Sequence, residues 1–158
     1  MAQITTTEMT ELVTPIMANL SGKMHGGELL KLLDKVALTC AMRYSSYYCV
    51  TLSVDKVVFR QPVFIGEMIT FVANINYTGR TSMEVGIKVI SENLKEKSVR
   101  HTNTCYFTMI AVNDDGKPTA IPQLIKTTEV QERRWEAALK RRNLSLQKAK
   151  ESKTNSEK

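Results

Sequence analysis

The residues best suited to chemistry in this 158-residue chain gather in one segment, NLSGKMHGGELLKLLD, which runs from Asn19 to Asp34. On a helical wheel of about 100° per residue, Asp34 falls beside leucines and away from the polar stripe that begins at Glu28. A carboxylate buried in such a place is costly unless it is paired or hydrogen-bonded, and it suits a general base near neutral pH. The alternative is that Asp34 caps a loop or pairs with Lys31 or Lys35.

Two glycines, Gly26 and Gly27, stand where that helix would begin, directly after His25. A helix start offers unpaired backbone N–H groups with partial positive charge, and glycine lets a carbonyl compound approach them closely. These amides could therefore stabilise an oxyanion. The alternative is a loop in which the glycines supply unusual backbone angles. His25 can change charge near neutral pH, whereas His101 lies in a predicted strand and is expected to be structural.

The elements that would position these residues are a long apolar helix and a sheet. The sequence from Gly27 to about Tyr44 predicts a helix that is apolar over most of its circumference. Stretches rich in β-branched and aromatic residues predict five strands, at 7–15, 47–59, 67–78, 82–93 and 98–112. Their short connections favour antiparallel pairing. The expected fold is therefore α+β, with a five-stranded antiparallel sheet wrapped around one long central helix. One small sheet cannot enclose such a helix, so a dimer is expected.

The basic excess of the chain lies at its C-terminal end. Residues 126–158 hold ten of the 22 Lys and Arg but five of the 16 Asp and Glu, so their net charge is +5, against +1 over residues 1–125. A nucleic-acid reader usually shows a basic face across its folded domain, so nucleic acid is not an expected partner. We predict one domain over residues 1–125, followed by a basic, exposed helix at 127–150 and a disordered polar tail.

Composition argues against several other classes of protein, among them membrane proteins, zinc proteins and serine hydrolases. No run of about eighteen apolar residues and no signal segment is found, so no membrane partner is predicted and the expected location is the cytoplasm. Three cysteines in apolar stretches, without a Cys-x-x-Cys spacing, are expected to be reduced and buried: Cys40, Cys49 and Cys105. The two histidines do not form a zinc motif, and no Gly-x-Ser-x-Gly indicates a serine hydrolase.

The spaced set of an Asn, a His-Gly-Gly and a helical Asp resembles the catalytic signature of hotdog-fold acyl-CoA thioesterases of the cytosolic, YciA-like type: Asn19, His25, Gly26, Gly27 and Asp34. The interval of 15 positions between the Asn and the Asp matches the family pattern. The resemblance continues through SVDKVVFRQPVFIGEMITF and YTGRTSMEVGIKV, and it covers residues 10–112. Many family members carry an acidic residue two positions before the Asn, where this chain has Met17.

This resemblance implies that the chain hydrolyses acyl-CoA to a free fatty acid and coenzyme A at a site shared by two subunits. Asn19 of one subunit would face Asp34 of the other and position the water or the carbonyl. Asp34 would act as general base or as nucleophile. The Gly27 amide would face the oxyanion, with His25 and Gly26 in supporting roles. No cofactor is implied beyond the coenzyme A of the substrate, and the implied assembly is a homohexamer built as a trimer of dimers.

The resemblance also implies coenzyme A contacts in the Gly-Arg-Thr-Ser hairpin, formed by Gly79, Arg80, Thr81 and Ser82. The alternative is a hairpin turn with a solvated arginine. Arginines at helical spacing in the tail would bind the nucleotide end of coenzyme A or form a solvated face: Arg133, Arg134, Arg141 and Arg142.

Two other functions stay open. A hotdog hydratase usually needs a catalytic His near an acid on the central helix, and no His lies between Gly26 and Arg100. A non-catalytic module that binds or senses acyl-CoA would be expected to adjoin a helix-turn-helix segment, and the sequence shows none.

Overall fold

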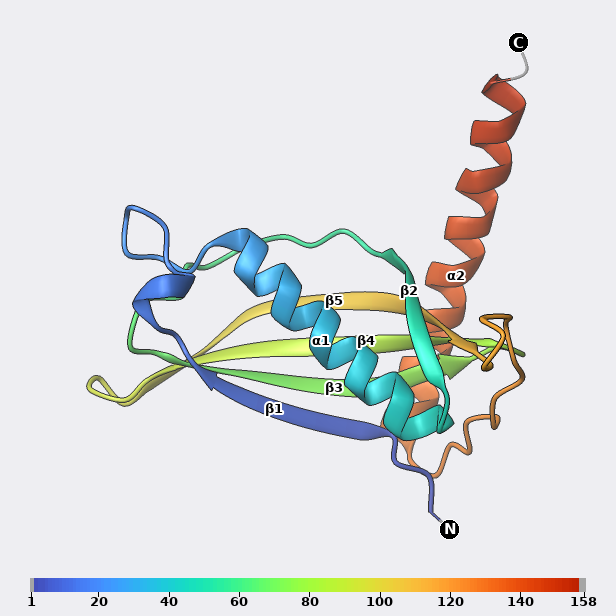
Figure 1. The fold of residues 1–158 in the computed structure, drawn as a ribbon, viewed down its shortest axis with the longest axis horizontal. Coiled ribbons are helices and arrows are strands. Elements are labelled where there is room, and N and C mark those ends of the chain that lie inside the picture. The colour runs from blue at the N-terminus through green and yellow to red at the C-terminus, as the bar shows by residue number, and fades with distance from the viewer. Residues whose placement is uncertain (1, 157–158) are drawn as a thin grey trace.

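The computed structural model describes residues 2–156 (Figure 1). Five antiparallel strands form one sheet with the spatial order β1-β3-β4-β5-β2. In chain order these strands are β1 (Thr6–Leu12), β2 (Tyr48–Val54), β3 (Met68–Thr78), β4 (Ser82–Asn93) and β5 (Ser98–Val112). Two long helices accompany the sheet, α1 (Gly26–Ser45) and α2 (Glu129–Ser156), together with a short 3-10 turn at Pro15–Met17.

Helix α1 lies across the concave face of the sheet, which wraps around it as predicted (Figure 1). Its apolar side chains and the inward side chains of the strands alternate to form one core, because a strand sends every second residue to the same face. Leu33 of α1 is completely buried there, as are Ile69 of β3 and Ile87 of β4. The helix ends where Ser46 adopts a left-handed conformation at φ 62°. The predicted α+β hotdog fold is confirmed.

The largest differences from the predicted strand boundaries are at the ends of β1 and β2. Strand β1 ends at Leu12, because Pro15 opens a 3-10 turn and cannot donate a ladder hydrogen bond. Strand β2 ends at Val54, and the predicted continuation to Phe59 is wrong. Residues 55–67 instead cross from β2 to β3 without regular structure, apart from an isolated bridge at Phe64. Strands β4 and β5 have their predicted bounds.

Helix α2 differs from the exposed helix that the sequence predicted. Its first half packs on the outer face of the sheet, where Ala138 is buried and the Trp135 ring lies 5.4 Å from that of Tyr77. Its second half projects away from the sheet (Figure 1). The helix also continues to Ser156, beyond the predicted end at 150, since no glycine or proline interrupts it. Of the predicted disordered tail, residues 157 and 158 lie outside the described residues.

Over residues 2–156, neither helix is long and apolar enough to span a membrane. In the same described part of the chain, no cluster of three or more His, Cys, Asp or Glu side chains is arranged to hold a metal ion.

Candidate active site

Asp34 lies two turns into α1, and its carboxylate accepts a hydrogen bond from the hydroxyl of Thr51 on β2, at 2.6 Å between the oxygens. The prediction that Asp34 is buried among leucines is wrong for the single chain, in which its side chain is exposed. The reason is that the neighbouring surface of α1 is uncovered, so that Leu30 is exposed as well. No ion pair between Asp34 and a lysine of α1 is found among the described residues.

Thr51 is a candidate site residue that sequence reasoning missed. It sits where the register of β2 against β5 shifts between Thr51 and Ser53, and its Oγ1 also lies 3.6 Å from Met109 Sδ. A threonine on a strand has no distinguishing local signal, because β-branched residues are common there. Only the packing of α1 against β2 brings this hydroxyl to the carboxylate.

Asn19 lies in the loop before α1 and is exposed. Its side-chain oxygen accepts hydrogen bonds from the Ser21 amide at 3.0 Å, the Ser21 hydroxyl at 2.8 Å and the Lys23 amide at 3.3 Å. Within residues 2–156, no direct contact joins Asn19 to Asp34. The structure therefore fixes each of the two side chains separately and does not bring them together in one chain.

The His-Gly-Gly segment caps the start of α1. His25 occupies the N-cap position, and its Nδ1 accepts a hydrogen bond from the Gly27 amide at 3.1 Å. The Gly27 N–H, predicted to meet an oxyanion, thus has an acceptor in this structure. Neither glycine has a positive φ, so the alternative of unusual backbone angles is wrong. Instead, a Cβ on Gly27 would crowd His25 Nδ1 at 3.3 Å, and a Cβ on Gly26 would touch the Phe59 ring.

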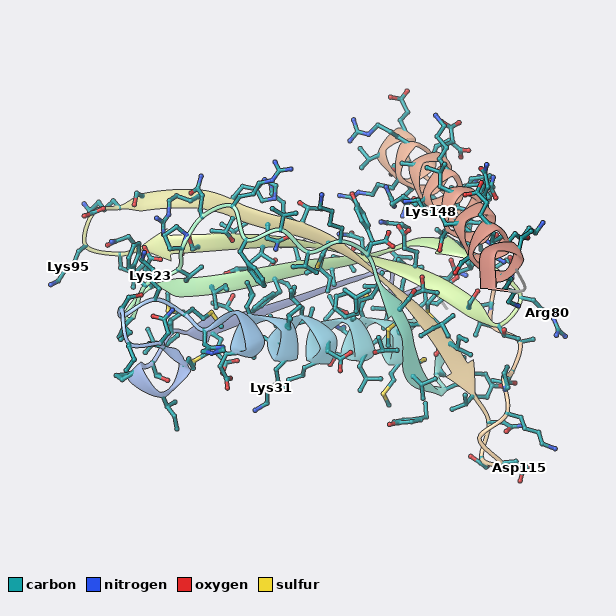
Figure 2. All side chains as sticks on the ribbon, turned by 90° about the horizontal axis from the view of Figure 1, so that it is seen from above. Lys23, Lys31, Arg80, Lys95, Asp115 and Lys148 are labelled. Carbon is teal, nitrogen blue, oxygen red and sulfur yellow. The ribbon has the colours of Figure 1, made fainter. Side chains whose placement is uncertain are left out.

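The Gly79–Ser82 hairpin joins β3 to β4 at the other end of the sheet from the Asn19 loop. Figure 2 shows this separation, with Lys23 at one end and Arg80 at the other. Strand β3 spans the distance, and its 11 residues extend about 35 Å. The hairpin closes with a hydrogen bond from the Gly79 amide to the Ser82 carbonyl, and Arg80 is exposed. One chain therefore places these two parts of the predicted site far apart.

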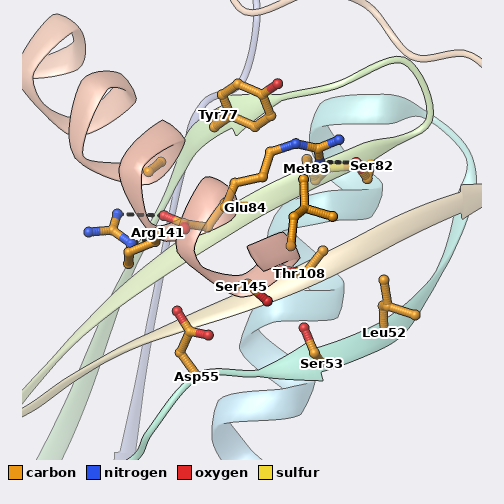
Figure 3. Close-up of a pocket in the computed structure, with 13 residues that line it drawn as sticks. Leu52, Ser53, Asp55, Tyr77, Ser82, Met83, Glu84, Thr108, Arg141 and Ser145 are labelled. Atoms are coloured by element: carbon orange, nitrogen blue, oxygen red, sulfur yellow. Dashed lines mark hydrogen bonds and ion pairs between the residues drawn. The ribbon is translucent and has the colours of Figure 1, made fainter. Parts of the chain in front are cut away.

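A cavity of about 130 Å³ lies between this hairpin, β2 and α2 (Figure 3). Arg142 of α2 reaches into it, with its guanidinium 3.5 Å from Ser82 Oγ and 5.5 Å from the centre of the Tyr77 ring. Asp55 lines the opposite wall. Burial, and then repulsion from Glu84, raises the pKa of the Asp55 carboxyl, while Arg141 and Lys148 act in the opposite direction.

The tail arginines have different surroundings. Arg141 forms a two-pronged ion pair with Glu84, at 2.7 and 3.0 Å, and stacks 3.6 Å above the Tyr106 ring. Since Glu84 is buried, this pair anchors α2 to the sheet, and the predicted solvated face does not include Arg141. Arg133 and Arg134 line a recess over the outer face of the sheet, next to Arg141.

The remaining residues, the three cysteines and His101, are predicted from the sequence to be structural. The three cysteines are free and buried, as expected. Burial raises the pKa of Cys40 to about 11 and that of Cys105 to about 12, which keeps both thiols protonated and unreactive. The ring of His101 contacts its own strand, with Nε2 2.9 Å from the Asn103 carbonyl and 2.8 Å from Thr104 Oγ1.

Comparison with known proteins identifies relatives over most of the chain. The model of the thioesterase superfamily matches residues 21–98. The chain is 55% identical over 136 residues to Protein VdlD of Helicobacter pylori (strain ATCC 700392 / 26695), covering 86% of this chain and 78% of that protein. It is 30% identical over 134 residues to the uncharacterized acyl-CoA thioester hydrolase YkhA of Bacillus subtilis (strain 168), covering 85% of this chain and 78% of that protein.

Solved structures agree with these relatives. An apo-hexameric acyl-CoA thioesterase superimposes with a TM-score of 0.87 and 35% identity, over 91% of this chain and 92% of that chain. An acyl-CoA hydrolase from Staphylococcus aureus, in complex with butyryl coenzyme A, coenzyme A and coenzyme A disulfide, superimposes with a TM-score of 0.86 and 28% identity. The match covers 96% of this chain and 93% of that chain. Variants of that enzyme carry alanine at an Asn, an Asp 15 positions later, or a Thr 17 positions after the Asp. The chain thus belongs to the thioesterase superfamily, among the acyl-CoA thioester hydrolases with the hotdog fold.

Proposed function

We propose that this chain hydrolyses acyl-CoA to a free acid and coenzyme A, with Asp34 as the reacting carboxylate and Asn19 supplied by a second copy. The observation that carries this proposal is the short hydrogen bond from Thr51 to Asp34, which holds an otherwise exposed carboxylate in one orientation. The three side chains Asn19, Asp34 and Thr51 have spacings of 15 and 17 positions. The residues replaced in the Staphylococcus aureus variants have the same two spacings.

The chemistry follows from a fixed carboxylate next to a thioester. As a general base, Asp34 takes a proton from water, the water oxygen attacks the carbonyl carbon, the C–S bond breaks, and the proton held by Asp34 passes to the sulfur so that coenzyme A leaves as its thiol. As a nucleophile, Asp34 would itself attack the carbonyl carbon, the C–S bond would break, and coenzyme A would leave as a thiolate that takes a proton from solvent. Water would then hydrolyse the resulting mixed anhydride to the free acid and restore the Asp34 carboxylate. In both routes Thr51 donates to the carboxylate oxygen that does not react. The Gly27 amide could join the oxyanion site only if the His25 ring turned away from it.

A second copy is required because the surfaces around Asp34 are apolar and uncovered. The two edges of the sheet differ: β1 ends the sheet with a row of threonines and glutamates, whereas β2 carries Tyr48 and Leu52 with exposed fractions of 60% and 63%. An apolar edge strand with unpaired backbone groups can form hydrogen bonds with a strand of another chain. Antiparallel pairing of β2 with its copy about a two-fold axis runs the two sheets in opposite directions. The Asn19 loop of each copy would then lie toward the Gly79–Ser82 hairpin of the other.

Coenzyme A would bind beside that hairpin. The cavity in Figure 3 offers the Arg142 guanidinium and the Ser82 hydroxyl for phosphate oxygens, with the Tyr77 ring adjacent. Arg80 is exposed at the hairpin tip and provides a further cation. We further propose that these dimers assemble into a homohexamer, since two similar proteins of known structure are described as hexameric. The cytoplasmic location stays a prediction from the sequence.

Replacing Asp34 by asparagine tests the proposal. We expect the rate of thiol release from acyl-CoA to fall at least about 100-fold, because the asparagine side chain can neither take the proton nor attack. Binding of coenzyme A, measured by calorimetry, should survive. The matched control is Asp115→Asn in the exposed turn after β5, which should leave turnover unchanged. Full hydrolysis by the Asp34 variant would remove this carboxylate from the mechanism. A wild-type protein that binds coenzyme A without releasing thiol would instead favour the acyl-CoA sensor.

A further inference from the structure

The backbone N–H, the backbone carbonyl and the side-chain oxygen of Asn19 all form hydrogen bonds within the loop that carries this residue. The Asn19 amide donates to the Lys23 carbonyl at 2.8 Å, and the Asn19 carbonyl accepts from the Gly22 amide at 3.0 Å. Gly22 has a φ of +74°, which glycine adopts without strain. The Gly22 carbonyl in turn accepts from the Ile65 amide, and Lys23 bridges Phe64, so the loop is tied to the chain between β2 and β3. The backbone therefore presents Asn19 rigidly.

The hydrogen bonds also identify which end of the Asn19 side chain points outward. Two of its three donors are the backbone amides of Ser21 and Lys23, which can only donate, so the atom that they meet must be the oxygen. The Ser21 hydroxyl supplies the third and shortest bond at 2.8 Å. An amide oxygen has two lone pairs, so three donors leave it no capacity for another. The two Nδ2 hydrogens have no partner within residues 2–156.

We propose that Ser21 is a positioning residue, which locks the Asn19 side-chain oxygen into its own loop so that Asn19 meets the substrate only as a hydrogen-bond donor. This inference rests on the proposed function, because it assigns a role within that site. The acceptor that gains most from a donor is the thioester carbonyl oxygen, since it becomes negatively charged when the carbon is attacked. Asn19 Nδ2 is thus the oxyanion donor, and Asn19 does not accept a proton from the attacking water.

The state of the other candidate donor supports this assignment. The Gly27 amide already donates to His25 Nδ1 at 3.1 Å, so it is not offered to a substrate in this structure. The residue Asn19 is exposed and lies in a fixed loop, where a second copy or a bound thioester can reach its side chain. A donor that is fixed before the substrate arrives costs no reorganisation during the reaction.

The variant Asn19→Asp tests whether the Asn19 side chain acts on the substrate as a hydrogen-bond donor or as an acceptor. Aspartate keeps the shape of the side chain and an oxygen that can accept from Ser21 and Lys23, but it has no N–H group. We expect kcat to fall about 100- to 1000-fold with KM nearly unchanged, which is the effect of removing one oxyanion donor. If Asn19 instead accepted a proton from water, the carboxylate would serve at least as well. Retention of a tenth or more of the wild-type kcat would therefore overturn the proposal.

Ser21→Ala and Ser21→Thr test the positioning role. The alanine variant should lose about fivefold in kcat, the factor that a neutral hydrogen bond contributes, at an unchanged KM. The threonine variant keeps the hydroxyl and should recover most of that loss. Thermal unfolding of each variant shows whether the loop change disturbs the fold. A Ser21→Ala enzyme with wild-type kcat would show that the two backbone amides suffice and that Ser21 positions nothing.

The outcome for Asp34→Asn keeps this inference separate from the proposed function. If that variant is inactive while Asn19→Asp and Ser21→Ala turn over at the wild-type rate, the proposed function stands and the donor assignment fails. If Asp34→Asn is fully active, the proposed function itself fails, and the donor assignment fails with it.

Discussion

Replacing Thr51 by valine would show how much the hydroxyl that holds Asp34 contributes to catalysis. Valine keeps the branched shape of threonine, so the packing of β2 against β5 should persist while the donor is lost. The distance of 2.6 Å between Thr51 Oγ1 and Asp34 Oδ1 lies in the short range typical of hydrogen bonds to ionised carboxylates. Such a bond contributes about 1.5–3 kcal/mol. Because Asp34 is exposed in the single chain, we expect about 2 kcal/mol, which is about a 30-fold fall in kcat.

The assay is the rate of thiol release at saturating acyl-CoA, with urea unfolding as a check on the fold. Thr51→Ser keeps the hydroxyl and should stay within a few fold of the wild type. The double variant of Thr51→Val and Asp34→Asn should be no slower than Asp34→Asn alone, because Thr51 acts through that carboxylate. A Thr51→Val enzyme within twofold of the wild-type kcat would refute the reasoning.

Three other predictions concern the frame of the site. Arg141→Met should lower the free energy of unfolding by about 2–3 kcal/mol in urea titration, because it leaves the buried Glu84 without its cation. Adding Glu84→Gln should restore part of that free energy, and a wild-type midpoint for the single variant would contradict the anchoring role of the pair. Leu52→Lys on the apolar β2 edge of the sheet should shift sedimentation toward the monomer and reduce turnover. Thr10→Lys on the polar β1 edge should change neither, and equal dimer content in the two variants would rule out pairing through β2. A thiol reagent at about pH 8 should label the three buried cysteines only after unfolding, so rapid labelling of the native protein with loss of activity would show that a thiol is accessible at the site.

Much of the fold was predictable from local pattern. The long run without proline or glycine after Gly27 specifies α1, and β-branched residues bounded by turn formers specify β4 and β5 with their observed ends. The boundaries failed where local pattern is ambiguous. Residues 55–59 have strand-like composition but leave the sheet, because β2 pairs with β5 only as far as Val54. The C-terminal helix was predicted, yet its packing depends on a charge pair 57 positions apart in sequence.

Local sequence was enough to identify the candidates Asn19, His25, Gly27 and Asp34, since periodicity and turn chemistry act over a few residues. The contacts of these residues became known from the folded chain alone. The fold placed the Thr51 hydroxyl on the Asp34 carboxylate, left that carboxylate exposed in the single chain, and set His25 on the Gly27 amide. These contacts cannot be read from spacing because a hydrogen bond requires an approach within about 3 Å. Contact between residues distant in the chain follows from the packing of whole elements, which no local pattern encodes.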